Sequence, residues 1–414
     1  MRQYPVSVVI PTFNRSVLLH RTLTTLANQS GNTPEFEVVV ADDGSTEDIR
    51  AVCGRFEGEL NVQYVRQARN GFRAGAARNL GAKAARGAVI VFLDCGTLAG
   101  PRFVQGHAKL HAGFEQDVPS TWRAVMAPTY GYDVEPQDRS WVRALFLDSS
   151  RELRPQTLLH VVGMRDYRDL RLSEIGFDMA RLAVPWRFFW SRNISLRREV
   201  HSLIGGFDES FTEYGVEDIE FGYRLYRSGV RFAWAPEPWA AEVPDEDEDR
   251  GLRAGSNGRN LRRLVSMYAD AEVDFYVANR PLPGEEQVEF DALGAWQGSL
   301  GEDDGESLVA EFGEFERPCL VVGAGGGFRR PQHDVFCLDP TAPPSLGDWD
   351  RREAPSRPMS GFGFRTGFRD ERFRSVLLTR RLTGIWAQWG GALKAEASRV
   401  GGAVLVSHSL ADVE

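Results

Sequence analysis

Acidic and hydroxyl side chains follow three predicted strands and begin one predicted helix. They are Thr12, Asp42, Asp43 and Asp94 at the strand ends, and Glu217 with Asp218 at the helix start. Carboxylates in such places accept hydrogen bonds from a ligand, take a proton from a reacting hydroxyl, or hold a divalent cation. Acidic residues are also favoured at helix N-termini by the helix dipole alone, which is the alternative for Glu217 and Asp218.

Repeated strand–helix units must position these side chains. The predicted strands are Val6–Ile10, Val38–Ala41, Val62–Val65 and Ala88–Leu93, and the predicted helices run from Asn14, as cap, to Gln29 and from Arg73 to Arg86. Short connections between such units imply a doubly wound, mostly parallel α/β sheet. Ligands of these sheets lie beyond the carboxyl ends of the strands, where the acidic residues stand.

The pattern changes after residue 113. Residues 115–185 are irregular, a strand is predicted at Phe188–Leu196, and helices are predicted at Glu217–Arg227 and Asn257–Ala278. We expect one α/β domain over residues 1–280, with halves 1–113 and 114–280. A linker at 281–284 precedes a second, smaller α/β domain at 285–414. Its predicted strands are Cys319–Val322, Val335–Leu338, Ser375–Leu378 and Ala403–Val406, with a helix at Gly384–Arg399.

Several motifs resemble those of the family 2 glycosyltransferases. They are VVIPTFN at 8–14, VVADDGST at 39–46, GAARNLG at 75–81, VFLD at 91–94, NISLR at 193–197, GGFDE at 205–209 and GVED at 215–218. The order and spacing of these segments carry the resemblance, which covers about residues 4–245. It implies a GT-A fold and inverting transfer of a sugar from a nucleotide-sugar donor.

The resemblance implies a donor site in the first half of the chain. We expect the donor to contact Thr12, Phe13, Asn14, Asp42, Asp43, Arg78 and Asp94. Phe13 would stack on a uracil ring, and Asp42 would accept the imide hydrogen bond. The alternative for Phe13 is a core position, and that for Arg78 is a surface salt bridge. Turn formation or helix capping is expected of one of the two residues Asp42 and Asp43.

The expected metal motif is incomplete. Family members usually carry Asp-x-Asp, but this chain has Asp94-Cys95-Gly96. Neither Gly96 nor Cys95 suits the hard cations Mn²⁺ or Mg²⁺, which prefer oxygen ligands. Glu242 is a substitute ligand, so we predict a divalent cation at Asp94 and Glu242. The alternative is that arginines neutralise the diphosphate instead.

The resemblance assigns the reaction to the Glu-Asp pair. Asp218 would be the general base that takes the proton from the acceptor hydroxyl, and Glu217 its acceptor-side partner. Asp208 and Trp190 are further candidates for binding the acceptor. A turn-forming role is the alternative for Asp208. Core packing is the alternative for Trp190 and for the neighbouring Trp186.

Two other patterns have ordinary explanations. His107 and His111 have the i, i+4 spacing of a helical metal pair but lack an HExxH motif, so we expect two polar helix residues near the surface. The glycine-rich turn 323–327, with Asp339 ending the next strand, outlines a dinucleotide or S-adenosylmethionine site. Arg329-Arg330-Pro331 leaves little room for the helix such a site needs, so a remnant used in packing or self-association, such as homo-oligomer formation, is expected.

Composition excludes several classes of protein. The net charge of −9 gives no electrostatic footprint for nucleic acid, and no apolar run is long enough to insert in a membrane. The four cysteines lack metal or disulfide spacing, and the first residues lack the pattern of a leader. These features predict a soluble cytoplasmic protein.

Together the residues predict an inverting glycosyltransferase that uses a UDP-sugar and a soluble acceptor, a natural product or the end of a glycan. One alternative is a metal-independent enzyme with a GDP- or dTDP-sugar. Another is a non-catalytic nucleotide-sugar-binding or scaffold protein, which would have no need of the pair Glu217-Asp218. A third is a bifunctional protein whose second domain binds S-adenosylmethionine.

Overall fold

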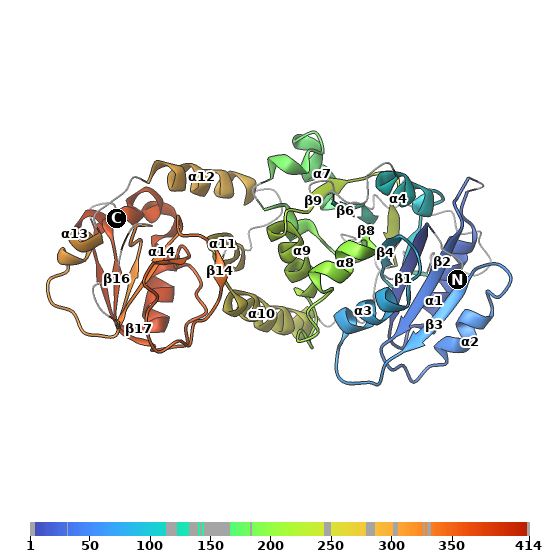
Figure 1. Ribbon diagram of the computed structural model, residues 1–414, viewed down its shortest axis with the longest axis horizontal. Helices are drawn as coiled ribbons and strands as arrows, with labels where there is room; N and C mark the ends of the chain where they lie inside the picture. The colour runs from blue at the N-terminus through green and yellow to red at the C-terminus, as the bar shows by residue number, and fades with distance from the viewer. Residues whose placement is uncertain are drawn as a thin grey trace. The chain divides into compact units, whose positions relative to one another are not determined.

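The computed structural model describes residues 5–30, 32–112, 122–131, 140, 143–144, 166–182, 184–243, 250–278, 286–300, 305–325, 328 and 333–411. The chain forms two compact units, Met1–Asn257 and Gly258–Glu414 (Figure 1). The division falls inside one long helix. The linker predicted at 281–284 lies outside the described residues.

The first unit alternates strands and helices in the predicted order. Its elements are β1 (Val6–Thr12), α1 (Ser16–Ala27), β2 (Phe36–Asp42), α2 (Ile49–Gly54), β3 (Val62–Arg66), α3 (Ala74–Ala84), β4 (Val89–Leu93), β5 (Thr97–Ala99), α4 (Phe103–His111), β6 (Arg123–Met126), β7 (Thr129–Tyr130), α7 (Tyr167–Glu174), the 3-10 helices η3 (Met179–Arg181) and η4 (Pro185–Phe188), β8 (Asn193–Arg197), α8 (Arg198–Ile204), α9 (Glu217–Arg227), β9 (Arg231–Trp234) and β10 (Ala240–Glu242).

A seven-stranded sheet with the order β3-β2-β1-β4-β8-β6-β9 forms the centre of this unit. Only β8 runs antiparallel to its neighbours, so the predicted mostly parallel α/β fold is confirmed. A smaller sheet has the order β5-β10-β7, and its strand β5 follows β4 in the chain. The pairing of β10 with β5 places Glu242 opposite Thr97. This pairing brings a residue from the end of the unit to the segment that follows β4.

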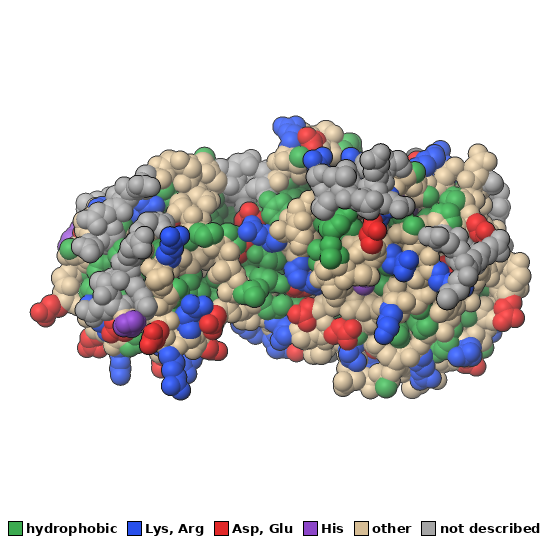
Figure 2. Space-filling model, in the orientation of Figure 1, with side chains coloured by type: hydrophobic (Ala, Val, Ile, Leu, Met, Phe, Trp, Pro, Cys, Tyr) green, Lys and Arg blue, Asp and Glu red, His purple; other side chains and the backbone are tan. Residues whose placement is uncertain are grey.

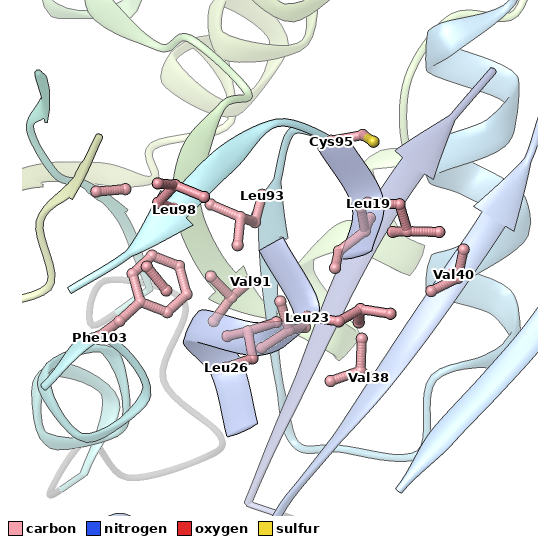
Figure 3. Packing of buried hydrophobic residues seen from close by; sticks show 14 of the residues in the cluster. Leu19, Leu23, Leu26, Val38, Val40, Val91, Leu93, Cys95, Leu98 and Phe103 are labelled. Atoms are coloured by element: carbon pink, nitrogen blue, oxygen red, sulfur yellow. The ribbon is translucent and has the colours of Figure 1, made fainter. Parts of the chain in front are cut away.

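Apolar strands and amphipathic helices build the core on both sheet faces. On one face, leucines of α1 pack against the aliphatic side chains of β2 and β4 (Figure 3). On the other face α3 lies so close to β1 that a Cβ on Gly81 would be 2.4 Å from Val9 Cγ1. Glycine at position 81 therefore permits the close approach that holds α3, and with it Arg78, over the strand ends.

Four details differ from the sequence-based expectation. Asn14 does not cap α1: it has a φ of +49° and accepts hydrogen bonds from Thr46 and Glu47 instead. Part of the predicted strand Phe188–Leu196 is 3-10 helix and turn. β6 was not predicted, yet it is an interior strand. The long helix expected at 257–278 is α10 (Arg250–Met267), β11 (Tyr268–Ala269) and α11 (Ala271–Ala278).

The second unit is also α/β, as predicted. Its remaining elements are α12 (Glu286–Ser299), α13 (Gly305–Ala310), β12 (Cys319–Val322), β13 (Val335–Asp339), β14 (Ser345–Leu346), β15 (Met359–Ser360), β16 (Phe373–Leu378), the 3-10 helix η5 (Arg380–Leu382), α14 (Thr383–Val400), β17 (Gly401–Val406) and α15 (His408–Ala411). Its parallel sheet has the order β15-β13-β12-β16-β17, and β11 pairs with β14.

In the described part of the glycine-rich segment, residues 323–325, Gly325 binds Asp339 at the end of β13. Asp339 is fully buried and accepts hydrogen bonds from the N–H groups of Gly325 (2.8 Å) and Thr341 (2.9 Å). A carboxylate that binds a ribose must present its oxygens to the ligand. The contacts of Asp339 support a packing role for this turn.

None of the described helices is long and apolar enough to cross a membrane. On the face seen in Figure 2, acidic and basic side chains are interspersed.

Candidate active site

The carboxyl ends of β1, β2 and β4 bring the predicted acidic residues to one edge of the sheet. Thr12 and Asp42 end β1 and β2 in register with each other, and Asp94 follows β4 directly. The N-terminus of α9 brings Glu217 to the same edge, although more than a hundred residues separate it from Asp94 in sequence. The topology therefore brings together residues that the motifs identified in separate pieces, and their roles in a site stay a prediction.

Arg78 connects the two halves of the site. Its Nη2 donates to Asp94 Oδ1 (2.8 Å) and its Nη1 to Glu217 Oε1 (3.0 Å). Only 4% of Arg78 is exposed, so this is a buried bridge rather than the surface salt bridge considered from sequence. Burial alone would lower the pKa of Arg78, but the charges of Asp94 and Glu217 outweigh it and raise that pKa. The guanidinium is therefore a permanent charge at the centre of the site.

Glu217 and Asp218 lie in an environment that resists ionisation. Burial, helped by the adjacent Asp218 charge, raises the pKa of Glu217 to about 7 despite Arg78. Burial also raises the pKa of Asp218. Glu217 Oε2 is buried and has no hydrogen-bond partner in the described part of the protein. A raised pKa suits a carboxylate that must receive a proton near neutral pH.

Asp218 is oriented by two backbone amides. Its Oδ2 accepts from the N–H of Ser191 (3.1 Å) and its Oδ1 from the N–H of Ile219 (2.8 Å). Val216, which precedes the pair Glu217-Asp218, has a φ of +75°, which is costly for a β-branched side chain. This strained turn places the pair Glu217-Asp218 at the start of α9.

Asp42 and Asp43 both accept hydrogen bonds from other groups of the protein. Asp42 is 1% exposed and accepts from the Ser45 N–H (2.8 Å) and the Tyr64 hydroxyl (2.7 Å). Asp43 accepts from Gln67 Nε2 (2.6 Å) and from the N–H of Arg73 (3.0 Å). The turn-forming role that we expected of one of the two is seen in Asp42, whereas Asp43 joins the end of β2 to the segments at Gln67 and Arg73. A uracil-binding role for Asp42 stays a prediction.

Phe13, Asn14 and Thr12 lie together at the end of β1. The guanidinium of Arg69 covers the ring of Phe13, with its carbon 3.6 Å from the ring centroid. Phe13 is partly exposed and so is not a core residue. Thr12 points inward, where its hydroxyl donates to Cys95 Sγ (3.4 Å). Stacking of Phe13 on a base stays a prediction.

The predicted acceptor residues have different surroundings. Asp208 accepts hydrogen bonds from the N–H and hydroxyl of Ser210, as a turn-forming residue does. Trp186 is fully buried, so it packs in the core. Trp190 is partly exposed, and the guanidinium groups of Arg168 and Arg192 lie over its ring at 4.4 Å and 5.0 Å.

The predicted cation ligands are each paired with an arginine. Asp94 binds Arg78, and Glu242 Oε2 accepts from Arg192 Nη1 (2.6 Å). Burial raises the pKa of Cys95 to about 11, so it is a neutral thiol at neutral pH. No cluster of three possible metal ligands occurs among the described residues. Hard cations need several oxygen ligands whose charge is not already compensated, and this set of side chains does not fit one.

His107 and His111 are structural, but they are buried rather than near the surface as expected. Both bind the hydroxyl of Ser195, at 2.8 Å and 2.9 Å, and His107 also binds Asn193 Oδ1 (2.9 Å). Burial lowers their pKa values to about 4 and about 3. The two rings are therefore neutral groups that join α4 to β8.

Comparison with known proteins identifies the family of the chain. The family model "Glycosyl transferase family 2" matches residues 7–135, and the model "N-terminal domain of galactosyltransferase" matches residues 172–242. The chain is 34% identical to validoxylamine A glucosyltransferase from Streptomyces hygroscopicus subsp. jinggangensis, over 97% of this chain and 96% of that protein. The chain belongs to family 2 of the glycosyltransferases.

Two further matches of this glycosyltransferase cover a smaller share of the chain. Hyaluronan synthase from Pasteurella multocida is 34% identical over 61% of this chain but only 26% of that protein. A crystal structure of TarS from S. aureus in complex with UDP-GlcNAc is 16% identical, with a TM-score of 0.44 over 72% of this chain and 76% of that one. The match to the Streptomyces enzyme, in contrast, includes the second unit of the glycosyltransferase.

Two arginines of this glycosyltransferase that contact predicted site residues were not predicted from the sequence. Arg69 covers Phe13, and Arg192 binds Glu242. Neither residue belongs to a motif that we quoted, but Arg192 directly precedes the segment NISLR at 193–197. Their roles depend on contacts between distant segments, and sequence spacing carries no signal for these.

The raised pKa of Glu217 predicts a pH-dependent stability. Between its ordinary value of 4.5 and about 7, the folded glycosyltransferase holds a proton at Glu217 that the unfolded chain releases. Its contribution to stability is therefore present below this window and is lost as the pH rises through it. We expect the unfolding temperature of the wild type, relative to Glu217→Gln, to fall between about pH 5 and about pH 8. A constant difference in thermal melts across this range would contradict the assignment.

Proposed function

We propose that this glycosyltransferase transfers a sugar from a UDP-sugar, with inversion, to a hydroxyl group of a small natural product. The observation that carries the mechanism is the placement of Asp218. It has a raised pKa, two orienting amides, and a position on the same sheet edge as Phe13 and Asp94. The relative named validoxylamine A glucosyltransferase, similar over nearly the whole chain, supports the acceptor class and a glucosyl donor.

The proposed reaction is a single in-line displacement. Asp218 takes the proton from the acceptor hydroxyl while the hydroxyl oxygen bonds to the anomeric carbon. The bond between that carbon and the diphosphate oxygen breaks, and its electron pair leaves with the nucleoside diphosphate. Attack opposite the leaving group inverts the anomeric configuration. Glu217, through its buried Oε2, would hold the acceptor beside Asp218.

The donor would lie along the carboxyl ends of β1, β2 and β4. Phe13 offers a partly exposed ring for the base, next to the turn that Asn14 and Asp42 hold after β2. Arg78 fixes the carboxylate of Asp94 at the same edge of the sheet. A parallel sheet of this kind binds its ligand at this edge.

Two experiments test the proposal. A thermal-shift panel with UDP, GDP and dTDP, each with Mn²⁺ or EDTA, reports the preferred base. Stabilisation by GDP or dTDP but not UDP would replace the donor that we propose. Incubation with UDP-glucose and validoxylamine A, followed by mass spectrometry, should reveal addition of one hexose, and NMR of the product should reveal the inverted configuration.

Removing the ring of Phe13 should weaken nucleotide binding. We expect Phe13→Ala to lower the affinity for UDP by the value of one stacked base, about 1–3 kcal/mol. Isothermal titration calorimetry measures the effect. Phe36→Ala is the matched control, because Phe36 begins β2 at the opposite end of the sheet. Equal affinities in wild type and Phe13→Ala would remove Phe13 from the donor site.

A further inference from the structure

The turn Trp190–Arg192 joins the donor side of the site to the base. Arg192 accepts a hydrogen bond from the Asp94 N–H at its carbonyl (3.3 Å) and donates from Nη1 to Glu242 Oε2 (2.6 Å). The preceding residue, Ser191, donates its N–H to Asp218 Oδ2 (3.1 Å). One short turn therefore fixes the main chain at Asp94, the side chain of Glu242 and the orientation of Asp218.

The guanidinium of Arg192 is held on two sides. Glu242 binds one edge, and the ring of Trp190 lies 5.0 Å from the guanidinium carbon. The Arg192 side chain is 15% exposed, so little solvent screens its charge. Its field reaches Asp218: burial raises the pKa of that carboxyl, and the charges of Arg78 and Arg192 oppose the rise. Arg192 is thus a fixed positive charge that acts on the proposed base, carried by a turn whose main chain contacts Asp94.

A departing nucleoside diphosphate needs such a charge. Negative charge builds on the bridging oxygen as the bond to the sugar breaks, and fixed cations or donors aimed at that oxygen speed the reaction. The side chains at this corner do not fit a divalent cation, because Asp94 and Glu242 are each compensated by an arginine. A guanidinium carries five donors in a rigid fork, so it can bind phosphate oxygens while a carboxylate holds another edge.

We propose that Arg192, held in place by Glu242 and Trp190, binds the diphosphate of the donor and neutralises it as it leaves, in the place of a metal ion. The inference rests on the proposed nucleotide-sugar site. When the anomeric carbon–oxygen bond breaks, its electron pair passes to the diphosphate oxygen, which accepts hydrogen bonds from Arg192. Arg192 gives up no proton. Glu242 is a positioning residue and not a metal ligand.

The test measures UDP affinity by isothermal titration calorimetry in EDTA and in Mn²⁺. Wild type should bind UDP equally well in both. Arg192→Ala should bind at least about tenfold more weakly in both, which corresponds to one lost charged hydrogen bond. Arg192→Lys should recover part of the loss because it keeps the charge. Glu242→Gln should weaken binding several-fold in EDTA, with no dependence on Mn²⁺.

Arg231→Ala is the matched control. Arg231 is exposed and begins β9, and because β9 runs parallel to β6 and β4, this start lies at the sheet edge opposite Asp94. The substitution Arg231→Ala removes one positive charge, as Arg192→Ala does, and should leave the affinity for UDP unchanged. Thermal melts of every variant identify any loss of binding that comes from unfolding.

Several outcomes would overturn the proposal. Wild-type affinity that rises at least tenfold with Mn²⁺ and loses this gain in Glu242→Gln would make Glu242 a metal ligand. If Arg192→Ala and Arg192→Lys both bind UDP as tightly as the wild type, the pair of Arg192 with Glu242 is only a structural salt bridge. If Phe13→Ala weakens UDP binding while Arg192→Ala does not, only this inference fails. If UDP, GDP and dTDP all fail to bind the wild type, the proposed donor site fails as well.

Discussion

Asp218→Asn should lower the turnover number by about 10²- to 10⁴-fold while the affinity for UDP stays close to that of the wild type. A positioned general base contributes a factor of this size, and an amide cannot take the proton from the acceptor. The amide keeps one oxygen that can accept from Ser191 or Ile219, so the local structure should survive. Steady-state kinetics with UDP-glucose and calorimetry with UDP measure the two quantities separately.

The control for this substitution is Asp48→Asn. Asp48 caps α2 by accepting from the Ala51 N–H, and asparagine caps helices equally well. Its turnover should match the wild type. Loss of UDP affinity with normal turnover in Asp218→Asn would assign Asp218 to the donor site instead. If turnover and UDP affinity of Asp218→Asn both match the wild type, Asp218 is not the general base.

Arg78→Ala should destabilise the first unit by about 3 kcal/mol. Breaking a buried ion pair from one side costs about 3–5 kcal/mol, because the remaining charge is left without a partner. The lower value applies here because the Asp94 side chain is 38% exposed and can be hydrated, whereas that of Glu217 is 8% exposed. Urea unfolding of wild type and variant at about pH 8, above the pKa of about 7 of Glu217 in the wild type, measures the difference.

Two further variants make this prediction specific. Arg78→Ala combined with Glu217→Gln should be more stable than Arg78→Ala alone, since the amide needs no counter-charge. Arg73→Ala is the matched control: its pair with Glu209 is also 3.0 Å long but more exposed, so its loss should cost no more than about 1 kcal/mol. If both arginine substitutions have equal effects, Arg78 does not hold the site together as a buried bridge.

The sheet could be predicted because its strands carry their own signals. Short runs of β-branched residues such as Val6–Ile10 identify strands that are buried on both faces, and the alternation with helices predicts parallel pairing. β6 was missed because Arg123–Met126 is short and lies in an irregular region. It becomes a strand only because β8 and β9 supply hydrogen-bond partners on both sides. Pairing with distant segments decides such elements.

The site was predictable in its composition but not in its connections. Local motifs identified the residues at the strand ends and the pair Glu217-Asp218. They could not distinguish a carboxylate free for a ligand from one that closes a turn, as Asp42 does with Ser45 and Tyr64. They also failed for Asn14, which caps no helix but holds the turn after β2. Tyr64 and Thr46, the partners of Asp42 and Asn14, lie on other segments of the chain, and the contact of Asp42 with Ser45 depends on the backbone geometry of the turn.

The incomplete motif at Asp94 shows the same division. The sequence alone determined that Gly96 supplies no second carboxylate, and that Glu242 is a residue type able to replace it. Only the tertiary structure decided that Glu242 lies opposite Thr97 through the pairing of β10 with β5, and that Arg192 binds it there. Residue types set what chemistry a side chain can do. Which charged groups lie next to that side chain depends on which segments the sheet brings together, and only folding decides this.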